Sequence, residues 1–358
     1  MTASTPGHRS EPTHRLEPGH ARRPTIHDVA RDAGISKTSV SRYFGHERAL
    51  LSESMVQRIE AAIERLGFAP DRLASGLRGR RTGLIGMVVA DIRNPYTVDM
   101  LHGAELACRE HGYSLLVCNT DNSDQLERRH LEVLHGYSIE GLVVNTRGRN
   151  VASLAARREA GLPMVLVDRH IDGLDCDMVG LDNEQAVTLG VSHLRDQGYQ
   201  RLLMVTEPTD GISSRKARVE VFRHQAHAAG LSAEVQQSPQ ERIDPDWLAA
   251  TLMQWLRAGG RPGAIVCANG VITLAVCHAL WALLKTPFEQ VGVLGIDELS
   301  WCALVGPGIT TVAQPVDDIG YGAITTLLNR IRGAPGKAEI TTYTARLHAR
   351  GSTTLKTT

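Results

Sequence analysis

The sequence predicts a small all-α helix-turn-helix domain followed by a larger α/β domain with two lobes, each built on a parallel sheet. The length of 358 residues, at roughly 100–200 residues per domain, corresponds to two or three domains. Between residues 24 and 67, apolar residues recur at helical spacing in three short stretches. From Gly83, short apolar runs alternate with amphipathic stretches. That alternation is typical of parallel strands covered by helices on both faces.

The charge distribution separates the two parts. Lys plus Arg and Asp plus Glu both total 39, but residues 1–82 hold 14 basic against 9 acidic residues, which leaves 25 against 30 in the rest. A basic head on an acidic body indicates that the head contacts a polyanion. No apolar run reaches the ~18 residues of a membrane span, and residues 1–22 lack the apolar core of a signal peptide. We therefore expect a soluble, cytoplasmic protein with no membrane partner.

The cysteines and the first residues indicate neither a metal site nor a cofactor. The six cysteines are scattered, without a CxxC pair: Cys108, Cys118, Cys176, Cys267, Cys277 and Cys302. This spacing argues against a disulfide framework or a zinc site, so we expect buried free thiols. Residues 1–22 are rich in Pro, Gly, Ser, Thr and His, which predicts a disordered tail.

Residues 23–69 carry the start and stop signals of three short helices. Thr25 is placed to cap the first helix, with Asp28 completing a capping box, and Gly34 ends it. Ser36 precedes a second helix that runs to about residue 44. Ser52 precedes a third helix, with apolar residues at helical spacing as far as position 66. A tight glycine-containing turn between the first two helices is typical of a helix-turn-helix unit.

Residues 70–82 form a short basic segment dense in arginine, with glycines at 76 and 79. So short a segment is not stable as an isolated helix, because nucleation is costly and glycine disfavours helix. Two interpretations remain open: a basic linker, or a segment that folds only on contact with DNA.

The remainder, residues 83–353, reads as alternating strands and helices. Strands are expected at 83–90, 113–119, 141–145, 163–168, 201–206, 264–268 and 291–296. Helices are expected near 98–111, 123–137, 151–159, 183–197, 213–229, 246–258, 271–284 and 316–331. So many strands suit two similar subdomains better than one sheet. In such sheets ligands bind beyond the carboxyl ends of the strands.

The stretch PTIHDVARDAGISKTSVSRYF resembles the helix-turn-helix signature of the LacI/GalR family of bacterial transcriptional regulators. The resemblance continues through LGFAPDRLASGLRGRRTGLIGMVVADIRNPY, GYSLLVCNTD, GVLGID and TTVAQP to ARLHARGSTT, so it covers residues 23–353. It implies a homodimer whose effector domain is periplasmic-binding-protein-like and Rossmann-like. One subdomain would comprise about 83–182 and 315–342, and the other about 183–314 and 343–353. Within the family, the sequence most resembles repressors of 2-ketogluconate or gluconate utilisation.

The resemblance also assigns contacts with double-stranded operator DNA. Side chains on the second helix would read bases in the major groove, namely Lys37, Thr38, Ser41 and Arg42. Phosphates would be held by Thr25, His27 and Ser36. Residues 71–79 match the family's hinge helix, with Leu77 wedged between base pairs, Ala74 close to the groove floor, and Arg72 or Arg78 on phosphates. The alternative for Arg42 is a solvated helix face.

For the effector, the family pattern points to residues at strand ends between the lobes. The candidates are Asp91, Asn94, Tyr96, Asn119, Asn145, Arg147, Asp168, Arg169, Arg218, Phe222, Asn269 and Asp297. Asn, Asp and Arg offer bidentate hydrogen bonds to sugar hydroxyls, and an aromatic ring stacks on a sugar face. Phe222 stands one helical turn after Arg218, so both are expected to face one pocket. The three arginines favour an anionic effector such as an aldonate or keto-aldonate. For each arginine the alternative is pairing with Asp168 or Asp297.

Two other classes of protein fit the sequence less well. An enzyme would need a catalytic or phosphate-binding motif, but the chain has no GxGxxG after its first strand, no GxxxxGK[ST], no GxSxG and no HExxH. A periplasmic sugar-binding protein would have no use for residues 23–81. We therefore expect a repressor, not an enzyme, that a sugar acid releases from a pseudo-palindromic operator. A neutral sugar or a purine is the alternative effector.

Overall fold

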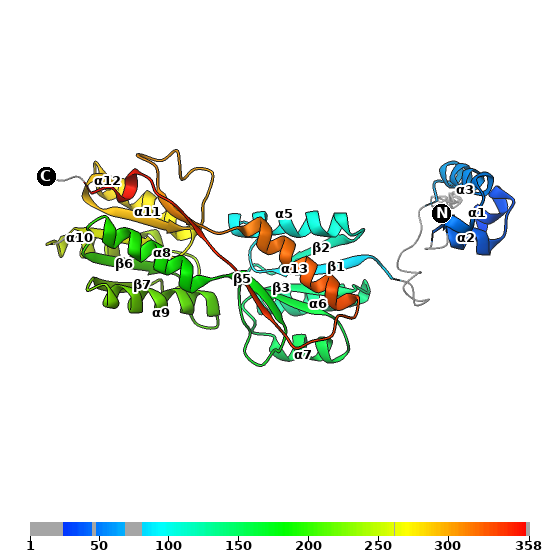
Figure 1. The fold of residues 1–358 in the computed structure, drawn as a ribbon, viewed down its shortest axis with the longest axis horizontal. Helices are drawn as coiled ribbons and strands as arrows, with labels where there is room; N and C mark the ends of the chain where they lie inside the picture. Colours follow the sequence, from blue (N-terminus) through cyan, green and yellow to red (C-terminus); the bar gives the residue numbers. More distant parts are fainter. Residues whose placement is uncertain (1–23, 45–47, 69–80, 261, 356–358) are drawn as a thin grey trace, which may run out of the picture. The chain divides into compact units, whose positions relative to one another are not determined.

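The computed structural model describes residues 24–44, 48–68, 81–260 and 262–355. The chain divides between Arg78 and Gly79 into two compact units (Figure 1). The predicted tail at 1–22 and nearly all of the predicted hinge at 70–82 lie outside the described residues.

The first unit confirms the three helices of a helix-turn-helix unit: α1 (Ile26–Ala33), α2 (Lys37–Tyr43) and α3 (Glu53–Leu66), with a 3-10 turn η1 (Arg48–Leu50) before α3. The Asp28 carboxylate accepts hydrogen bonds from the Thr25 amide (2.8 Å) and hydroxyl (2.6 Å). The Ser36 hydroxyl accepts from the Ser39 amide. Gly34 and Gly67 end α1 and α3 in the left-handed conformation that glycine adopts without strain.

The first lobe of the second unit is a six-stranded parallel sheet in the order β11-β5-β4-β3-β1-β2. Its strands are β1 (Leu84–Val89), β2 (Ser114–Asn119), β3 (Gly141–Asn145), β4 (Met164–Val167), β5 (Asp177–Leu181) and β11 (Ile340–Tyr343). One face is covered by α5 (Pro95–Glu110) and α13 (Val316–Ile331), the other by α6 (Asp124–Gly136) and α7 (Val151–Glu159).

The second lobe repeats this plan in the order β12-β10-β9-β8-β6-β7. Its strands are β6 (Arg201–Thr206), β7 (Ser232–Gln237), β8 (Gly263–Cys267), β9 (Gly292–Ile296), β10 (Thr310–Ala313) and the antiparallel β12 (Arg346–His348). Its helices are α8 (Asn183–Asp196), α9 (Ser213–Ala228), α10 (Pro245–Arg257), α11 (Gly270–Leu283), α12 (Pro287–Gln290) and η2 (Gly351–Thr353). The chain passes between the lobes after β5, after β10 and after β11.

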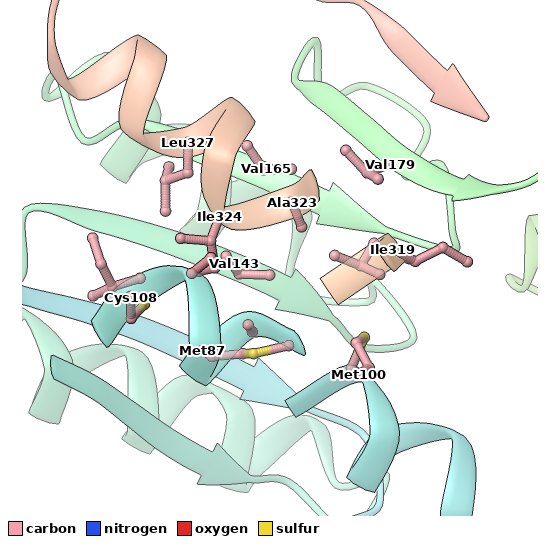
Figure 2. Close-up of a cluster of buried hydrophobic side chains, with 14 of the residues drawn as sticks. Met87, Met100, Cys108, Val143, Val165, Val179, Ile319, Ala323, Ile324 and Leu327 are labelled. Atoms are coloured by element: carbon pink, nitrogen blue, oxygen red, sulfur yellow. The ribbon is translucent and has the colours of Figure 1, made fainter. Parts of the chain in front are cut away.

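The strand side chains alternate between two apolar layers, as the period of a β-strand requires. In β1, Met87 faces the layer under α5 and α13, whereas Val88 faces the layer over α6 and α7. Figure 2 shows the first layer, in which Met87 and Val143 of the sheet lie opposite Met100 of α5 and Ile324 of α13. Five cysteines are buried free thiols as expected, and Cys118 is half-buried.

Prediction and structure differ in the number of strands, and three of the missed strands lack an apolar signal. The seven expected strands are all present, but five others were not singled out, among them β7, β11 and β12. Residues of these three strands are largely exposed at sheet edges, so their sequences carry no apolar run. Helix α5 begins at Pro95, earlier than expected, because Asn94 caps it and proline suits a first helical turn. No helix in the described parts of the chain has the length and hydropathy to cross a membrane.

The contact between α5 and α13 depends on two glycines. A Cβ atom built on Gly103 would lie 2.0 Å from the Asp317 carbonyl oxygen, and one on Gly320 would lie 2.1 Å from the Met100 carbonyl oxygen. These neighbours are backbone atoms, so they do not move aside as a flexible side chain would. The two helices therefore pack backbone to backbone above the first sheet.

We predict that Gly320→Ala lowers the free energy of unfolding of the effector domain by about 3 kcal/mol, the upper part of the range for overpacked sites. The measurement is urea denaturation followed by circular dichroism. Gly136→Ala is the matched control, because Gly136 ends a helix and a Cβ there meets no atom within 4 Å. Equal midpoints for both variants would show that the helix crossing tolerates a methyl group.

Candidate nucleic-acid interface and effector site

Helix α2 presents one polar face and one anchored face. Lys37, Thr38 and Arg42 are exposed and Ser41 is half-buried, while Val40 on the opposite side is fully buried. At 100° per residue, the four polar positions span about 140° of the helix circumference. The four predicted base-reading side chains thus share one face. Of the predicted phosphate contacts, His27 and Ser36 are exposed and Thr25 is half-buried.

Polar contacts at the end of α2 and in the turn before it hold this helix against α3. The Tyr43 hydroxyl donates to Glu60 (3.0 Å), and the Arg48 guanidinium pairs with the same carboxylate (2.7 Å) while lying 4.4 Å from the centre of the Tyr43 ring. The Arg58 guanidinium donates to the carbonyls of Ala33 (2.5 Å) and Gly34 (2.7 Å), in the turn between α1 and α2. The polar face therefore belongs to a helix that is held by contacts with α3.

In the second unit, polar residues follow the carboxyl ends of strands in both lobes. Two of them, Asp168 after β4 and Asp297 after β9, occupy equivalent places in the two sheets. Both have left-handed backbone conformations, with φ of 66° and 82°. Such conformations are uncommon outside glycine and cluster at functional sites.

Asp168 joins the two lobes. Its Oδ2 accepts a hydrogen bond from the Ser214 hydroxyl at the start of α9 (3.0 Å), and its Oδ1 lies 3.9 Å from Arg218 Nη2. The amide of His170 likewise donates to Ser213 of the other lobe (2.7 Å). Arg218 is held within its own lobe, because Nε donates to Asn183 (2.7 Å) and Nη1 to the Ala268 carbonyl (2.7 Å).

Arg169 differs from the other arginines of the site. Its side chain is 15% exposed and its Nε lies 3.5 Å from Asp168, beyond good hydrogen-bonding geometry. Nε and Nη1 are buried and have no hydrogen-bond partner among the described residues. Burial lowers the pKa of the guanidinium, although Asp168 opposes that shift. A buried donor without a partner costs free energy, so this position favours an added anionic acceptor.

Arg147 forms an ion pair with the other lobe, although its Nε is buried without a hydrogen-bond partner among the described residues. Its Nη2 lies 2.7 Å from Oε1 of Glu241, which belongs to the opposite lobe. Arg215 of α9 holds the other oxygen of Glu241 at 2.9 Å, and its Nη2 lies 3.1 Å from Glu207. Asn269 in turn donates to both oxygens of Glu207 at 2.9 Å.

Asp297 and Tyr96 belong to the same interlobe region, since, besides burial, the charges of Asp168 and Arg218 act on the pKa of both side chains. Oδ2 of Asp297 accepts from the Gly270 amide (2.8 Å) and Oδ1 from Gln314, yet burial still raises the pKa of this carboxyl. Burial also raises the pKa of Tyr96, whose hydroxyl is buried and without a partner in the described residues. A cavity of about 300 Å³ borders Tyr96, Asp297 and Gln314, but its wall also carries Asp99 and Asp317. Its acidity does not suit an anion, so the arginine cluster is the better anion site.

Several predicted residues satisfy their polar atoms locally. The Asp91 carboxylate accepts from Arg93 (2.9 Å), which lowers the pKa of Asp91. Asn94 caps α5, and Asn119 accepts from the Ile92 amide (2.9 Å). Asn145 is buried and donates to the Val167 carbonyl (3.0 Å). These side chains shape the carboxyl edge of the first sheet.

The expectation that Phe222 lines the effector pocket is wrong. Its ring is fully buried in the apolar core between the second sheet and helices α8 and α9. Arg218 and Phe222 do share the buried face of α9, but the ring packs into the core while the guanidinium reaches the strand ends.

Several polar partners in this region were not among the predicted site residues, including Glu207, Ser214, Arg215 and Glu241. Glu207 follows β6 directly, so the same rule that selected Asp168 applies to it. Ser214 and Arg215 open a helix, and Glu241 lies in a loop. No local signal marks those three.

The comparisons with known proteins agree with this geometry. Residues 25–71 match the family model described as bacterial regulatory proteins of the lacI family. Residues 82–350 match the model for periplasmic binding proteins and the sugar binding domain of the LacI family. The chain belongs to the LacI family. It is accordingly a DNA-binding transcriptional regulator with a helix-turn-helix head and a two-lobed effector domain.

Relatives of this LacI-family regulator match over nearly its whole length. It is 48% identical to the HTH-type transcriptional regulator PtxS of Pseudomonas aeruginosa, over 92% of this chain and 96% of that protein. It is 36% identical to the HTH-type transcriptional regulator KdgR of Bacillus subtilis, over 92% and 97% of the two chains. The crystal structure of the Lac repressor dimer bound to operator and the anti-inducer ONPF superposes with a TM-score of 0.79 at 22% identity, covering 94% and 100%. At that identity the likeness establishes the fold.

We predict that Arg42→Ala weakens binding to a selected operator by about 1–3 kcal/mol, the range for one bidentate base contact, and relaxes preference at one base position. Fluorescence anisotropy with operator and scrambled duplexes at one fixed salt concentration measures both effects. Arg65→Ala is the matched control, since it removes the same charge from an exposed side chain of α3, which pairs with Asp32 of α1. If both variants lose operator and scrambled binding equally, Arg42 contacts phosphate alone.

Proposed function

We propose that this LacI-family regulator is a homodimeric repressor of sugar-acid catabolism genes that a sugar acid, 2-ketogluconate or gluconate, releases from a pseudo-palindromic operator. The proposal places the protein in the bacterial cytoplasm, at the nucleoid when bound to DNA. The observation that carries the effector class is the buried guanidinium of Arg169, with two nitrogens unpartnered among the described residues. A carboxylate is the acceptor that matches a guanidinium in charge and shape.

The three candidate arginines differ in their ability to take a ligand. Arg147 is paired with Glu241 at 2.7 Å, and two nitrogens of Arg218 donate within its own lobe. Arg169 has Asp168 as its nearest carboxylate, at 3.5 Å. We therefore assign the effector carboxylate to Arg169. Around it we propose hydroxyl contacts from Asp168, Arg218, Asn269, Asp297 and Tyr96.

The same groups support binding of the sugar acid without its conversion. Asp168 and Asp297, the two carboxylates that an acid–base pair would need, accept hydrogen bonds from Ser214 and from the Gly270 amide. Because those bonds hold the lobes and the strand ends, we propose that both carboxylates orient the ligand and the lobes in a non-enzymatic protein, without transferring protons. The alternative effector classes, a neutral sugar or a purine, are separated from a sugar acid by the ligand panel below.

Control of DNA binding follows from two arrangements of the lobes. The bonds from Asp168 to Ser214 and from Arg147 to Glu241 exist only when the lobes are close together. An effector shifts the protein between arrangements only by binding one of them more tightly. We propose that this arrangement decides whether the paired hinge segments fold on the operator.

The experiment that tests the effector class is a thermal-shift series with 2-ketogluconate, gluconate, glucose and a purine. A ligand at 100 times its Kd stabilises the native protein by about 2.7 kcal/mol, which is readily seen. We expect the acids alone to raise Tm and to dissociate the operator complex. A rise with glucose or the purine alone would contradict the assignment of a sugar acid.

Arg169→Gln is predicted to weaken sugar-acid binding by at least about tenfold, because a charge-assisted bidentate contact is lost. Operator affinity without ligand should stay as in the wild type. The matched control is Arg158→Gln, an exposed arginine of the same lobe that pairs with Asp175 at 3.4 Å. Unchanged acid affinity in Arg169→Gln would remove this residue from the site.

Leu77→Ala is predicted to lower operator affinity while leaving effector affinity unchanged, because an apolar wedge between base pairs supports a kinked duplex. Residues 72, 74, 77 and 78 lie outside the described residues, so this proposal rests on the sequence resemblance. Gel-shift titration gives the first quantity and calorimetry the second. Wild-type operator affinity in the variant would exclude intercalation by Leu77.

A further inference from the structure

Four charged side chains are linked by ion pairs across the two lobes. None of them is among the proposed effector contacts. Glu207, Arg215 and Glu241 belong to the second lobe and Arg147 to the first. Their side chains are between 7% and 25% exposed. Charges this well buried persist only when they are paired.

Arg215 positions Glu241 toward the opposite lobe. Its Nη1 donates to Oε2 of Glu241 (2.9 Å) and to the Pro208 carbonyl (2.9 Å), while its Nη2 is fixed by Glu207 at 3.1 Å. With Oε2 held in this way, Oε1 of Glu241 meets Arg147 Nη2 at 2.7 Å. The carboxylate of Glu241 thus stands between two guanidiniums, one from each lobe.

These four charges lie close to Arg169, because its neighbour Asp168 accepts a hydrogen bond from Ser214 (3.0 Å), the residue before Arg215 in α9. Burial and Asp168 are the main influences on the pKa of Arg169, and Arg215 and Glu207 act on it as well. The guanidinium proposed for the effector carboxylate and the pair of guanidiniums around Glu241 therefore belong to one charged region between the lobes.

We propose that Glu241 is a specificity-determining residue that stands in for a second ligand carboxylate, so that the site accepts sugar acids with one carboxylate and rejects those with two. The inference rests on the proposed function. A ligand with one carboxylate satisfies Arg169 and leaves the chain of charges intact. A second carboxylate at the far end of the sugar would approach Glu241, a like charge, while Arg147 and Arg215 are already neutralised. Like charges brought together in a poorly solvated site repel strongly.

The test uses two matched ligand pairs that differ only in oxidation of the terminal carbon: gluconate with glucarate, and 2-ketogluconate with 2-ketoglucarate. Calorimetry on the full-length wild type should give an affinity for each dicarboxylate at least about tenfold below that of its monocarboxylate partner. In Glu241→Gln, Arg147 loses its carboxylate partner and Arg215 keeps only Glu207, so the ratio of dicarboxylate to monocarboxylate affinity should rise by at least about tenfold.

The double variant Arg147→Gln/Glu241→Gln separates charge pairing from a general loosening of the site. Because the released guanidinium of Arg147 is absent in it, the gain in dicarboxylate affinity should be smaller than in Glu241→Gln, where both loss of repulsion and a new ion pair contribute. Glu220→Gln is the matched control: it makes the same chemical change in the same lobe, at an exposed side chain 3.9 Å from Lys216. This control should keep the wild-type ratio.

Three results would overturn the inference and leave the effector class standing: equal binding of both acids by the wild type, an unchanged ratio in Glu241→Gln, or a gain as large in the double variant as in Glu241→Gln. The wild-type comparison needs no variant, so it decides even if Glu241→Gln fails to fold. If neither monocarboxylate binds the wild type, the proposed effector class falls, and this inference falls with it.

Discussion

The need to pair buried charges between the lobes governs the arrangement of the effector domain. Removing a charged group from water is costly unless an opposite charge or a set of hydrogen bonds replaces the solvent. Asp168 accepts a hydrogen bond from Ser214, and Arg147 forms an ion pair with Glu241. In each case the partner belongs to the other lobe. These partners exist only in one lobe arrangement, so charge pairing and lobe position are two aspects of one equilibrium. Arg169, whose pairing is incomplete, is the residue that we propose to bind the anion.

The scaffold places these charges by repeating one plan. Both sheets carry strands in equivalent order, and both place an aspartate with a left-handed backbone after the equivalent strand, Asp168 after β4 and Asp297 after β9. The apolar layers alternate along each strand, which holds the strand ends in register. In the first lobe, Gly103 and Gly320 let α5 and α13 pack backbone to backbone over the sheet. The polar edge thus rests on tightly packed apolar layers.

In the helix-turn-helix domain, the short helix α2 packs on a small apolar core. Val40 is the only fully buried residue of α2 in the described structure, so further support comes from polar contacts. Tyr43, Arg48 and Glu60 tie the end of α2 to α3, and Arg58 ties the turn before it. These contacts fix the end of α2 and the turn before it within the DNA-binding domain of a LacI-family regulator.

Helix boundaries, the principal strands and the family could be read from the sequence, because capping, periodicity and glycine stops act over a few neighbouring residues. Ser36, Ser52 and Gly67 are examples. The edge strands β7, β11 and β12 gave no signal, since exposed strands need no apolar run. From residue type alone, Arg147 and Arg169 were equally good candidates to bind an anionic effector. Only the tertiary structure distinguished them, because Glu241 comes from a distant loop of the other lobe and pairs with one of them alone. The tertiary structure also places the ring of Phe222 in the apolar core, because the packing around α9 depends on residues that are distant in the sequence.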